Sequence, residues 1–511
     1  MIILTLPATA QVTGQTNGRN QFNQMVNANA DFTIPDTVCQ GVPVTITNTS
    51  TSASNYYWDF CVADIRQPPV GVNMGNGGGN FRMPVFMDYV FENGNYYGFI
   101  VNFHNPGLTR LDFGNSLLNT PTYHYLGTVG GVIPDGAEGI QVVKNEGKWY
   151  AIIVGGNPVL GTVSKVLKVE FGTNIANPTP TATDWGNIGN LHMPLDLHLF
   201  KDGSNWYGFT VNGDNNTFTR FNFGTSFDNP PTGVNFGSVG GLAYPTGIHV
   251  LNDNGQWRVF VTNGGNNSRI NGTWSITRLD FGNSLLNNPV GVNLGNPGGF
   301  LKHPRDLTIM ISCGQIVGYA VNGAFSTNDI VMFDFNGDLT SVPTFSSLGN
   351  RGNLLFPVSI TKLFREGNDL YAFVVNVDNN TFTRLRFEGC DAAGLPPSTL
   401  QNPPPIVYST PGTYGINLTT DVGLSTQDAI CKPVVVLPKL VKRPTGTFEI
   451  CTGTTIKLGT QTSLGRHTWS TGANGDSITV SSGGHLLGRY RLLWMCQPRQ
   501  FRSGIKANAI R

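Results

Sequence analysis

Acidic, amide and histidine side chains recur at two kinds of position in this sequence. The first is the opening of an apolar stretch, and the second is a turn rich in Asn, Asp and Gly. The openings include "HMPLD" with His192 and Asp196 and "KHPRD" with His303 and Asp306. The turns include "NGDNN" with Asn212 and Asp214, "NVDNN" with Asn376 and Asp378, and "NGGNNSRINGTW", which ends at Trp274. If these side chains converge, they provide the donors, acceptors and aromatic face of a sugar or cation site.

Each of these residues also has a simpler structural interpretation. Asp196 and Asp306 can bond local backbone N–H groups, and Asn and Gly satisfy the geometry of tight turns. Which interpretation holds depends on whether the elements that carry them bring them to one face.

An internal repeat identifies those elements. Thr-Arg pairs recur at Thr109, Thr219, Thr277 and Thr383. Their spacings correspond to two, one and two repeat units of about 55 residues, in the range of β-propeller blades. Because the arginines recur in step (Arg110, Arg220, Arg278 and Arg384), we expect them to be structural. Each unit carries four strand signals, such as "LDLHLFKDG", "NWYGFTVNG", "TFTRFNFG" and "GVNFGSVGG". Sheets of this kind bury their faces by stacking radially.

The count of units predicts six blades. Second-strand patterns begin at Asn95, Lys148, Asn205, Gln256, Ile316 and Leu370. The sixth unit lacks a fourth strand, and "VGVNMGN" at Val70 to Asn76 has no first half before it. We therefore predict an all-β, six-bladed propeller over 68–388, closed by 70–76 beside Thr381–Phe387, which removes free sheet edges. The candidate residues would then meet at the mouth of the central channel.

The flanks of the repeat resemble the two halves of a PKD domain, an immunoglobulin-like β-sandwich. "VTITNTS" and "YYWDF" lie in 30–67, and "VYSTPGTYGINLTT" lies in 389–436. The resemblance implies that the propeller is inserted into the sandwich where the family continues with Gly-Asp-Gly, although Cys61 follows Phe60 here. It suggests bridges Cys61–Cys390 at the neck and Cys39–Cys431 within the sandwich. Buried free thiols are the alternative, because connectivity does not follow from sequence.

The two ends of the chain have their own character. Residues 1–29 begin with "MIILTLPATAQV", which we interpret as a signal peptide remnant followed by a linker. Residues 437–484 resemble part of a second immunoglobulin-like module of bacterial surface proteins. Residues 485–511 contain basic residues but no acid. Codons for this tail, read one nucleotide later, encode the strands that the module lacks, so we expect an out-of-frame translation.

Composition and motifs limit the function. The net charge is +1 and 12% of residues are charged, which gives no electrostatic footprint for nucleic acid. No stretch approaches the roughly 20 apolar residues of a membrane span, and neither G-x-S-x-G nor H-E-x-x-H occurs. We expect no metal and no cofactor.

The combination of domains resembles secreted and cell-surface proteins of Bacteroidota associated with gliding motility or type IX secretion. The resemblance implies a non-enzymatic, extracellular protein that binds a surface glycan or another extracellular protein in adhesion. The alternatives are a glycan hydrolase or lyase with acids at the channel mouth, and a purely structural spacer.

Overall fold

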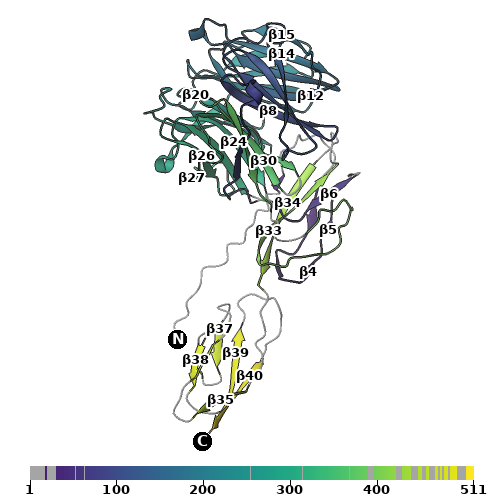
Figure 1. The fold of residues 1–511 in the computed structure, drawn as a ribbon, viewed down its shortest axis with the longest axis vertical. Coiled ribbons are helices and arrows are strands. Elements are labelled where there is room, and N and C mark those ends of the chain that lie inside the picture. The colour runs from purple at the N-terminus through teal and green to yellow at the C-terminus, as the bar shows by residue number, and fades with distance from the viewer. Residues whose placement is uncertain are drawn as a thin grey trace.

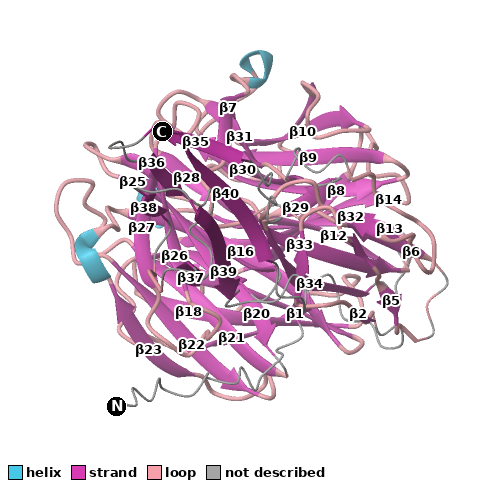
Figure 2. Ribbon diagram, turned by 90° about the horizontal axis from the view of Figure 1, so that it is seen from below, coloured by secondary structure: helices cyan, strands magenta, loops and turns pink. Residues whose placement is uncertain are grey.

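The computed structural model describes residues 30–438 except 52, 54, 63, 254, 313–314, 367–368, 390–394 and 422–427. It also describes β1 (Gly18–Arg19) and residues 447–451, 456–459, 466–469, 472–474, 477–480, 484–491 and 502–510. Within these residues the helical segments are short 3-10 turns at the periphery, η1 (Gly77–Gly79), η2 (Pro158–Leu160) and η3 (Pro297–Gly299), and strands dominate (Figure 2). No helix in this part of the chain has the length and apolar character to span a membrane. The all-β prediction is confirmed.

Six antiparallel sheets form the blades of a propeller (Figure 1). Their first strands are innermost, and neighbouring first strands contact one another around the ring, β28 to β8 included. Blades one to three contain β8 (Pro84–Glu92), β9 (Asn95–Asn102), β10 (Gly107–Gly114) and β11 (Thr122–Gly127); β12 (Ala137–Asn145), β13 (Lys148–Gly155), β14 (Lys165–Gly172) and β15 (Thr181–Gly186); and β16 (Pro194–Asp202), β17 (Asn205–Asn212), β18 (Thr217–Gly224) and β19 (Thr232–Asn235). Blades four to six contain β20 (Pro245–Asp253), β21 (Gln256–Asn263), β22 (Ser275–Gly282) and β23 (Val290–Gly295); β24 (Pro304–Ser312), β25 (Gln315–Gly323), β26 (Asn328–Asp334) and β27 (Thr344–Gly349); and β28 (Pro357–Ile360), β29 (Phe364–Glu366), β30 (Asp369–Asn376) and β31 (Thr381–Phe387).

The ring closes through β7 (Val70–Asn73), which completes blade six. It pairs antiparallel with β31, with Asn73 opposite Thr383 and Val70 opposite Arg386. The predicted closing strand is therefore confirmed.

The recurring arginines join neighbouring blades. The guanidinium of each donates to backbone carbonyls in the loop between the third and fourth strands of the next blade. Arg110 donates to Ala176, Arg220 to Leu285, Arg278 to Leu339 and Thr340, and Arg384 to Leu117 and Leu118. The expected structural role is confirmed.

Arg278→Ala should lower the free energy of unfolding by about 2–4 kcal/mol. The variant leaves the carbonyl of buried Leu339 and that of Thr340 without their charged donor and removes the packed stem of the side chain. Denaturant unfolding measures the change. Arg82→Ala, at an exposed arginine of blade one, is the control, and an equal loss in both variants would contradict the interblade role.

A second β module is built from both flanks of the propeller. One sheet contains β1, β34 (Asp428–Leu437), β33 (Gly412–Thr420) and β6 (Tyr56–Asp59), with β3 (Thr37–Cys39) also beside β34. Smaller sheets pair β2 (Phe32–Thr33) with β5 (Thr47–Asn48), and β4 (Pro43–Val44) with β32 (Ile406–Val407). Trp58 lies opposite Leu418 and is fully buried, so the module has one core drawn from both flanks. The propeller is therefore inserted as predicted, whereas the PKD assignment stays a prediction.

The cysteines only partly follow the prediction. Cys39, Cys61 and Cys431 are each disulfide-bonded. Cys39 lies opposite Leu437, which is six residues from Cys431 along β34. At about 3.3 Å per residue this separation is on the order of 20 Å, far beyond the roughly 7 Å that a disulfide spans. The Cys39–Cys431 pairing is therefore wrong. Cys390 lies outside the described residues, so Cys61–Cys390 stays a prediction.

The C-terminal region forms two further sheets. One contains β35 (Thr447–Cys451), β40 (Arg502–Ile510), β39 (Gly484–Arg491) and β37 (Arg466–Trp469), and the other contains β36 (Ile456–Gly459) and β38 (Ser477–Val480). Residues 485–511 thus supply most of β39 and all of β40, and the origin of this tail in a shifted reading frame stays a prediction.

Candidate functional site

A ring of six residues surrounds the channel where the innermost strands begin. We call it the mouth ring: Met83, Gly136, Met193, Tyr244, His303 and Phe356. All six have positive φ, between 47° and 52° for the five bulky residues and 78° for Gly136. The bulky five precede proline, which disfavours the ordinary helical conformation. Each such left-handed residue costs on the order of 1–2 kcal/mol, and strain of this kind concentrates at functional sites.

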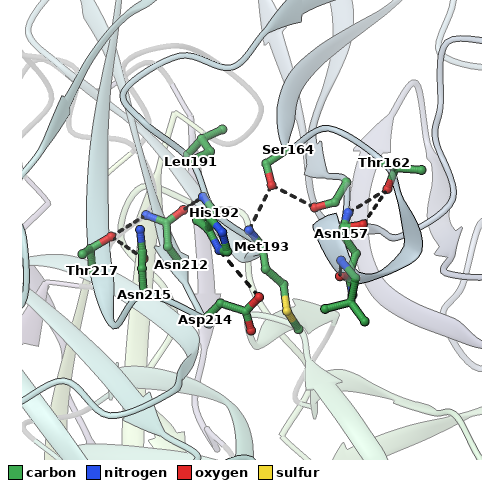
Figure 3. Close-up of polar contacts among 12 residues, drawn as sticks. Asn157, Thr162, Ser164, Leu191, His192, Met193, Asn212, Asp214, Asn215 and Thr217 are labelled. Atoms are coloured by element: carbon green, nitrogen blue, oxygen red, sulfur yellow. Dashed lines mark hydrogen bonds and ion pairs between the residues drawn. The ribbon is translucent and has the colours of Figure 1, made fainter.

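The preceding blade holds several ring residues in place. The N–H groups of Met83, Tyr244 and Phe356 donate to Asn380, Asn216 and Asn328 at 2.7, 2.6 and 2.8 Å. The N–H of Met193 donates to Ser164 (Figure 3). Blade two has a glycine at this position, and a Cβ atom there would meet Asn157 at 3.0 Å.

Glu138 is the second residue of β12, the innermost strand of blade two. This residue is 5% exposed, and its Oε2 atom has no hydrogen-bond partner among the described residues. Burial raises the pKa of Glu138 to about 8, with a further rise from Asp196 and an opposing effect of the Arg305 charge. Glu138 is therefore a neutral, proton-carrying carboxyl at pH 7. Burial raises the pKa of Tyr244 and the nearby charge of Arg305 opposes that rise. The Nε of Arg305 is likewise unpartnered within the described part of the chain.

Asp196 and Asp306 are two buried carboxyl groups that interact in the same channel. The negative charge of ionised Asp196 disfavours ionisation of Asp306, because two like charges are costly in a buried site. Burial is the main cause that raises both pKa values, to about 7 for Asp196 and well above the usual range for Asp306.

These two aspartates also join blades. Asp196 accepts the N–H of Ile248 and Asp306 that of Ile360, both at 2.8 Å, and Asp88 accepts the N–H of Val142 at 2.7 Å. The structural interpretation of Asp196 and Asp306 is thus correct as far as it goes. That interpretation does not account for the raised pKa values of the two carboxyl groups.

A polar cavity of about 30 Å³ lies further along the channel, with room for about two water molecules. Asp88, Asp196, Asp306, His198, His249 and Lys362 are among its lining residues. Lys362 is surrounded by protein yet reached by solvent through the channel, and its ammonium donates to Gln141 at 2.7 Å. Burial lowers the pKa of Lys362, as it does for His198 and His249.

The remaining predicted residues do not join this cluster. His192 and Asp214 lie at the rim, with 3.6 Å between Nδ1 and Oδ2 (Figure 3). His303 belongs to the mouth ring and stacks on Phe356, and burial lowers its pKa to about 3. Asp378 pairs with Arg269 at 2.9 Å. Trp274 lines a separate pocket with Lys302.

Two of the predicted ligand-binding residues are loop anchors, which corrects their assignment. Asn212 accepts the N–H of His192 and donates to Thr217 (Figure 3). Its second amide hydrogen is donated to Thr219. Asn376 does the same with Leu355, Thr381 and Thr383. Both side chains are fully buried and both amide donors are used within the blade, so neither can bind a ligand.

Sequence reasoning missed Glu138 and Arg305. Blade two opens with "PDGAEGIQ", in which the proline stands three residues before the strand. Aligning "AEGIQ" with "PLDLH" of blade three and "PRDLT" of blade five would have found both residues, because Glu138 and Arg305 occupy the same second position.

Comparison with known proteins indicates the fold. No family model matches this chain, and no curated protein matches it. Similar solved structures include an α-L-arabinofuranosidase from Podospora anserina (11% identity, 50% of this chain and 91% of that chain, TM-score 0.35). An α-L-arabinanase from Cellvibrio cellulosa (10%, 52% and 95%, 0.35) and a family-43 β-1,3-galactosidase with galactodeoxynojirimycin (13%, 56% and 99%, 0.37) are also similar. At these values the likeness concerns the propeller fold alone.

This finding corrects the functional prediction. The non-enzymatic, adhesive interpretation depended on an analogy of fold with surface proteins. The similar solved structures, which include family-43 glycoside hydrolases, arabinanases and arabinofuranosidases, are glycoside hydrolases instead. The prediction of a protein without enzymatic activity is therefore contradicted and is not retained.

Proposed function

We propose that this protein is a glycan-active hydrolase whose chemistry takes place at the channel mouth. The observation that carries the proposal is the buried Glu138 carboxyl with its unpartnered oxygen and raised pKa, in the same channel as the interacting carboxyl groups of Asp196 and Asp306. Glycoside hydrolysis needs one carboxylic acid to protonate the leaving oxygen and one carboxylate to act on water or on the sugar.

The electrostatics suggest a role for each group. Glu138 carries a proton at neutral pH and gives it to the glycosidic oxygen as the C–O bond breaks. The Arg305 charge, which favours ionised Glu138, then stabilises the carboxylate that remains. Asp196 takes a proton from the water whose oxygen bonds to the sugar carbon, and the N–H groups of Leu197 and Ile248 hold its carboxylate in place.

The geometry limits how the substrate approaches. A cavity of about 30 Å³ holds water but no sugar ring, so the sugar lies outside the channel with its glycosidic oxygen toward Glu138. The cavity, which Asp196 and Asp306 line, is the source of the attacking water.

Hydrolysis assays across pH test the proposal. The substrates are nitrophenyl α-L-arabinofuranoside, nitrophenyl β-D-galactoside, arabinan and galactan, chosen after the enzymes named above. We expect sugar release with a narrow optimum, because activity rises as Asp196 ionises near pH 7 and falls as Glu138 ionises near pH 8. Release from none of the substrates between pH 5 and 10 would overturn the proposal.

A further inference from the structure

A pocket of about 380 Å³ lies beside the channel mouth, in the size range of small-molecule sites. The loop between β21 and β22 supplies Ile270, Asn271, Gly272 and Trp274, and blade five supplies Lys302 and Ser326. Lys302 stands directly before His303 of the mouth ring and three residues from Arg305. The pocket and the acid cluster therefore share one segment of the chain.

Arg269 fixes the loop that forms this pocket. Its guanidinium donates to the carbonyl of Gly323 at 3.1 Å and to Asp378 at 2.9 Å. It also lies 4.1 Å from the ring centroid of Phe325 and 3.6 Å from that of Phe356. One side chain of blade four thus contacts blades five and six, so the pocket is formed before any ligand arrives.

The floor of the pocket is an indole lying against a glycine. A Cβ atom at Gly272 would come within 2.5 Å of Trp274 Nε1, so any other residue there would displace the ring. The buried Nε1 of Trp274 has no hydrogen-bond partner among the described residues.

Lys302 gives the pocket its charge. Its ammonium lies 5.6 Å from the Trp274 ring centroid, and no carboxylate of the described residues lies within ion-pair distance of it. Asn271 and Ser326 add neutral polar groups, and Ile270 next to them is 69% exposed. An aromatic ring, neutral donors and one uncompensated cation match a sugar ring that carries one negative group.

We propose that this pocket binds an anionic sugar residue, with the ring of the sugar on Trp274 and its carboxylate or sulfate on Lys302. The identification of this residue as part of a substrate depends on the proposed hydrolase function. The binding itself does not.

Binding to a variant that cannot turn over the ligand tests the inference. Tri-galacturonate, neutral galactotriose and a sulfated galactotriose are titrated by calorimetry into Glu138→Gln protein. We expect at least one anionic oligosaccharide to bind ten-fold or more tightly than the neutral one. Trp274→Ala should abolish binding, and Lys302→Ala should remove the preference for charge. Binding of the sulfated ligand in place of the uronate would assign the anionic group to sulfate.

A matched control exists in blade three, where Lys201 lies 5.7 Å from the ring centroid of Trp206. Lys201→Ala removes a lysine over a tryptophan away from the pocket and should leave the preference unchanged. Equal binding of neutral and anionic ligands, no binding of any, or a preference that survives Lys302→Ala overturns the inference. Anionic binding by a protein that hydrolyses no glycan would overturn the proposed function alone.

Discussion

Glu138→Gln should lose at least two orders of magnitude in kcat, since positioned acid–base groups contribute about 10²–10⁴-fold. The amide has the shape of the carboxylic acid but no proton to give to the leaving oxygen. The same change should make the protein more stable in alkaline solution, because burial opposes the charged form of Glu138 and not the amide.

The sign of the stability effect follows from linkage. The pKa of Glu138 rises from 4.5 to about 8 on folding, so its contribution to stability is fully present below pH 4.5 and is lost progressively as the pH rises to about 8. A difference of that size corresponds to a cost on the order of 5 kcal/mol above pH 8, of which roughly 3 kcal/mol is already present at pH 7. Denaturant unfolding at pH 5, 7 and 9 should show the variant gaining on the wild type chiefly between pH 5 and pH 7, with a smaller further gain at pH 9.

Glu146→Gln is the matched control, because Glu146 follows the same strand in an exposed turn. It should change neither kcat nor the pH dependence of unfolding. Full activity in Glu138→Gln would contradict the assignment of the proton donor. An unchanged stability at pH 9 would contradict the neutral state of the buried carboxyl.

Whether a residue recurs in every repeat distinguished structural residues from candidate site residues better than its residue type did. Arg278 recurs in step with its counterparts and serves as a link between blades. The same reasoning applied to Asn212 and Asn376 would have identified them as loop anchors, because blades one, four and five carry Asn102, Asn263 and Asn322 at the same place with the same contact.

The cluster at the mouth consists of positions where the blades differ. Glu138 and Arg305 share a strand position with apolar or hydroxyl residues elsewhere, and Asp196 shares one with Gly247 and Ser359. Burial sets the protonation of these groups, and burial follows from the closed ring and not from any local sequence. The predicted pairing of Cys39 with Cys431 was wrong for a related reason. Two cysteines on neighbouring strands are close only if the register places them opposite each other, and here Cys39 lies opposite Leu437.

Gly71→Val should open the ring. A Cβ atom at Gly71 would lie 2.4 Å from the carbonyl carbon of Arg351 and 2.7 Å from the nitrogen of Gly352, and neither backbone atom can move aside cheaply. Overpacking costs typically about 1–3 kcal/mol where the chain can adjust. Here β7 instead detaches, because it joins blade six through its pairing with β31 and is not linked to that blade by a hairpin, and β31 becomes a free edge.

Gly291→Val separates this effect from simple crowding. Gly291 of β23 meets the backbone of Gly240 at 2.4 Å in the same way, but β23 follows β22 directly in the chain and cannot leave blade four. We expect both variants to unfold at lower denaturant concentration, with the larger loss in Gly71→Val. Hydrogen exchange should show β31 amides losing protection in Gly71→Val, whereas β22 amides stay protected in Gly291→Val. Equal losses of stability with β31 still protected would mean that β7 adds a strand to a ring already closed by the contact between β28 and β8.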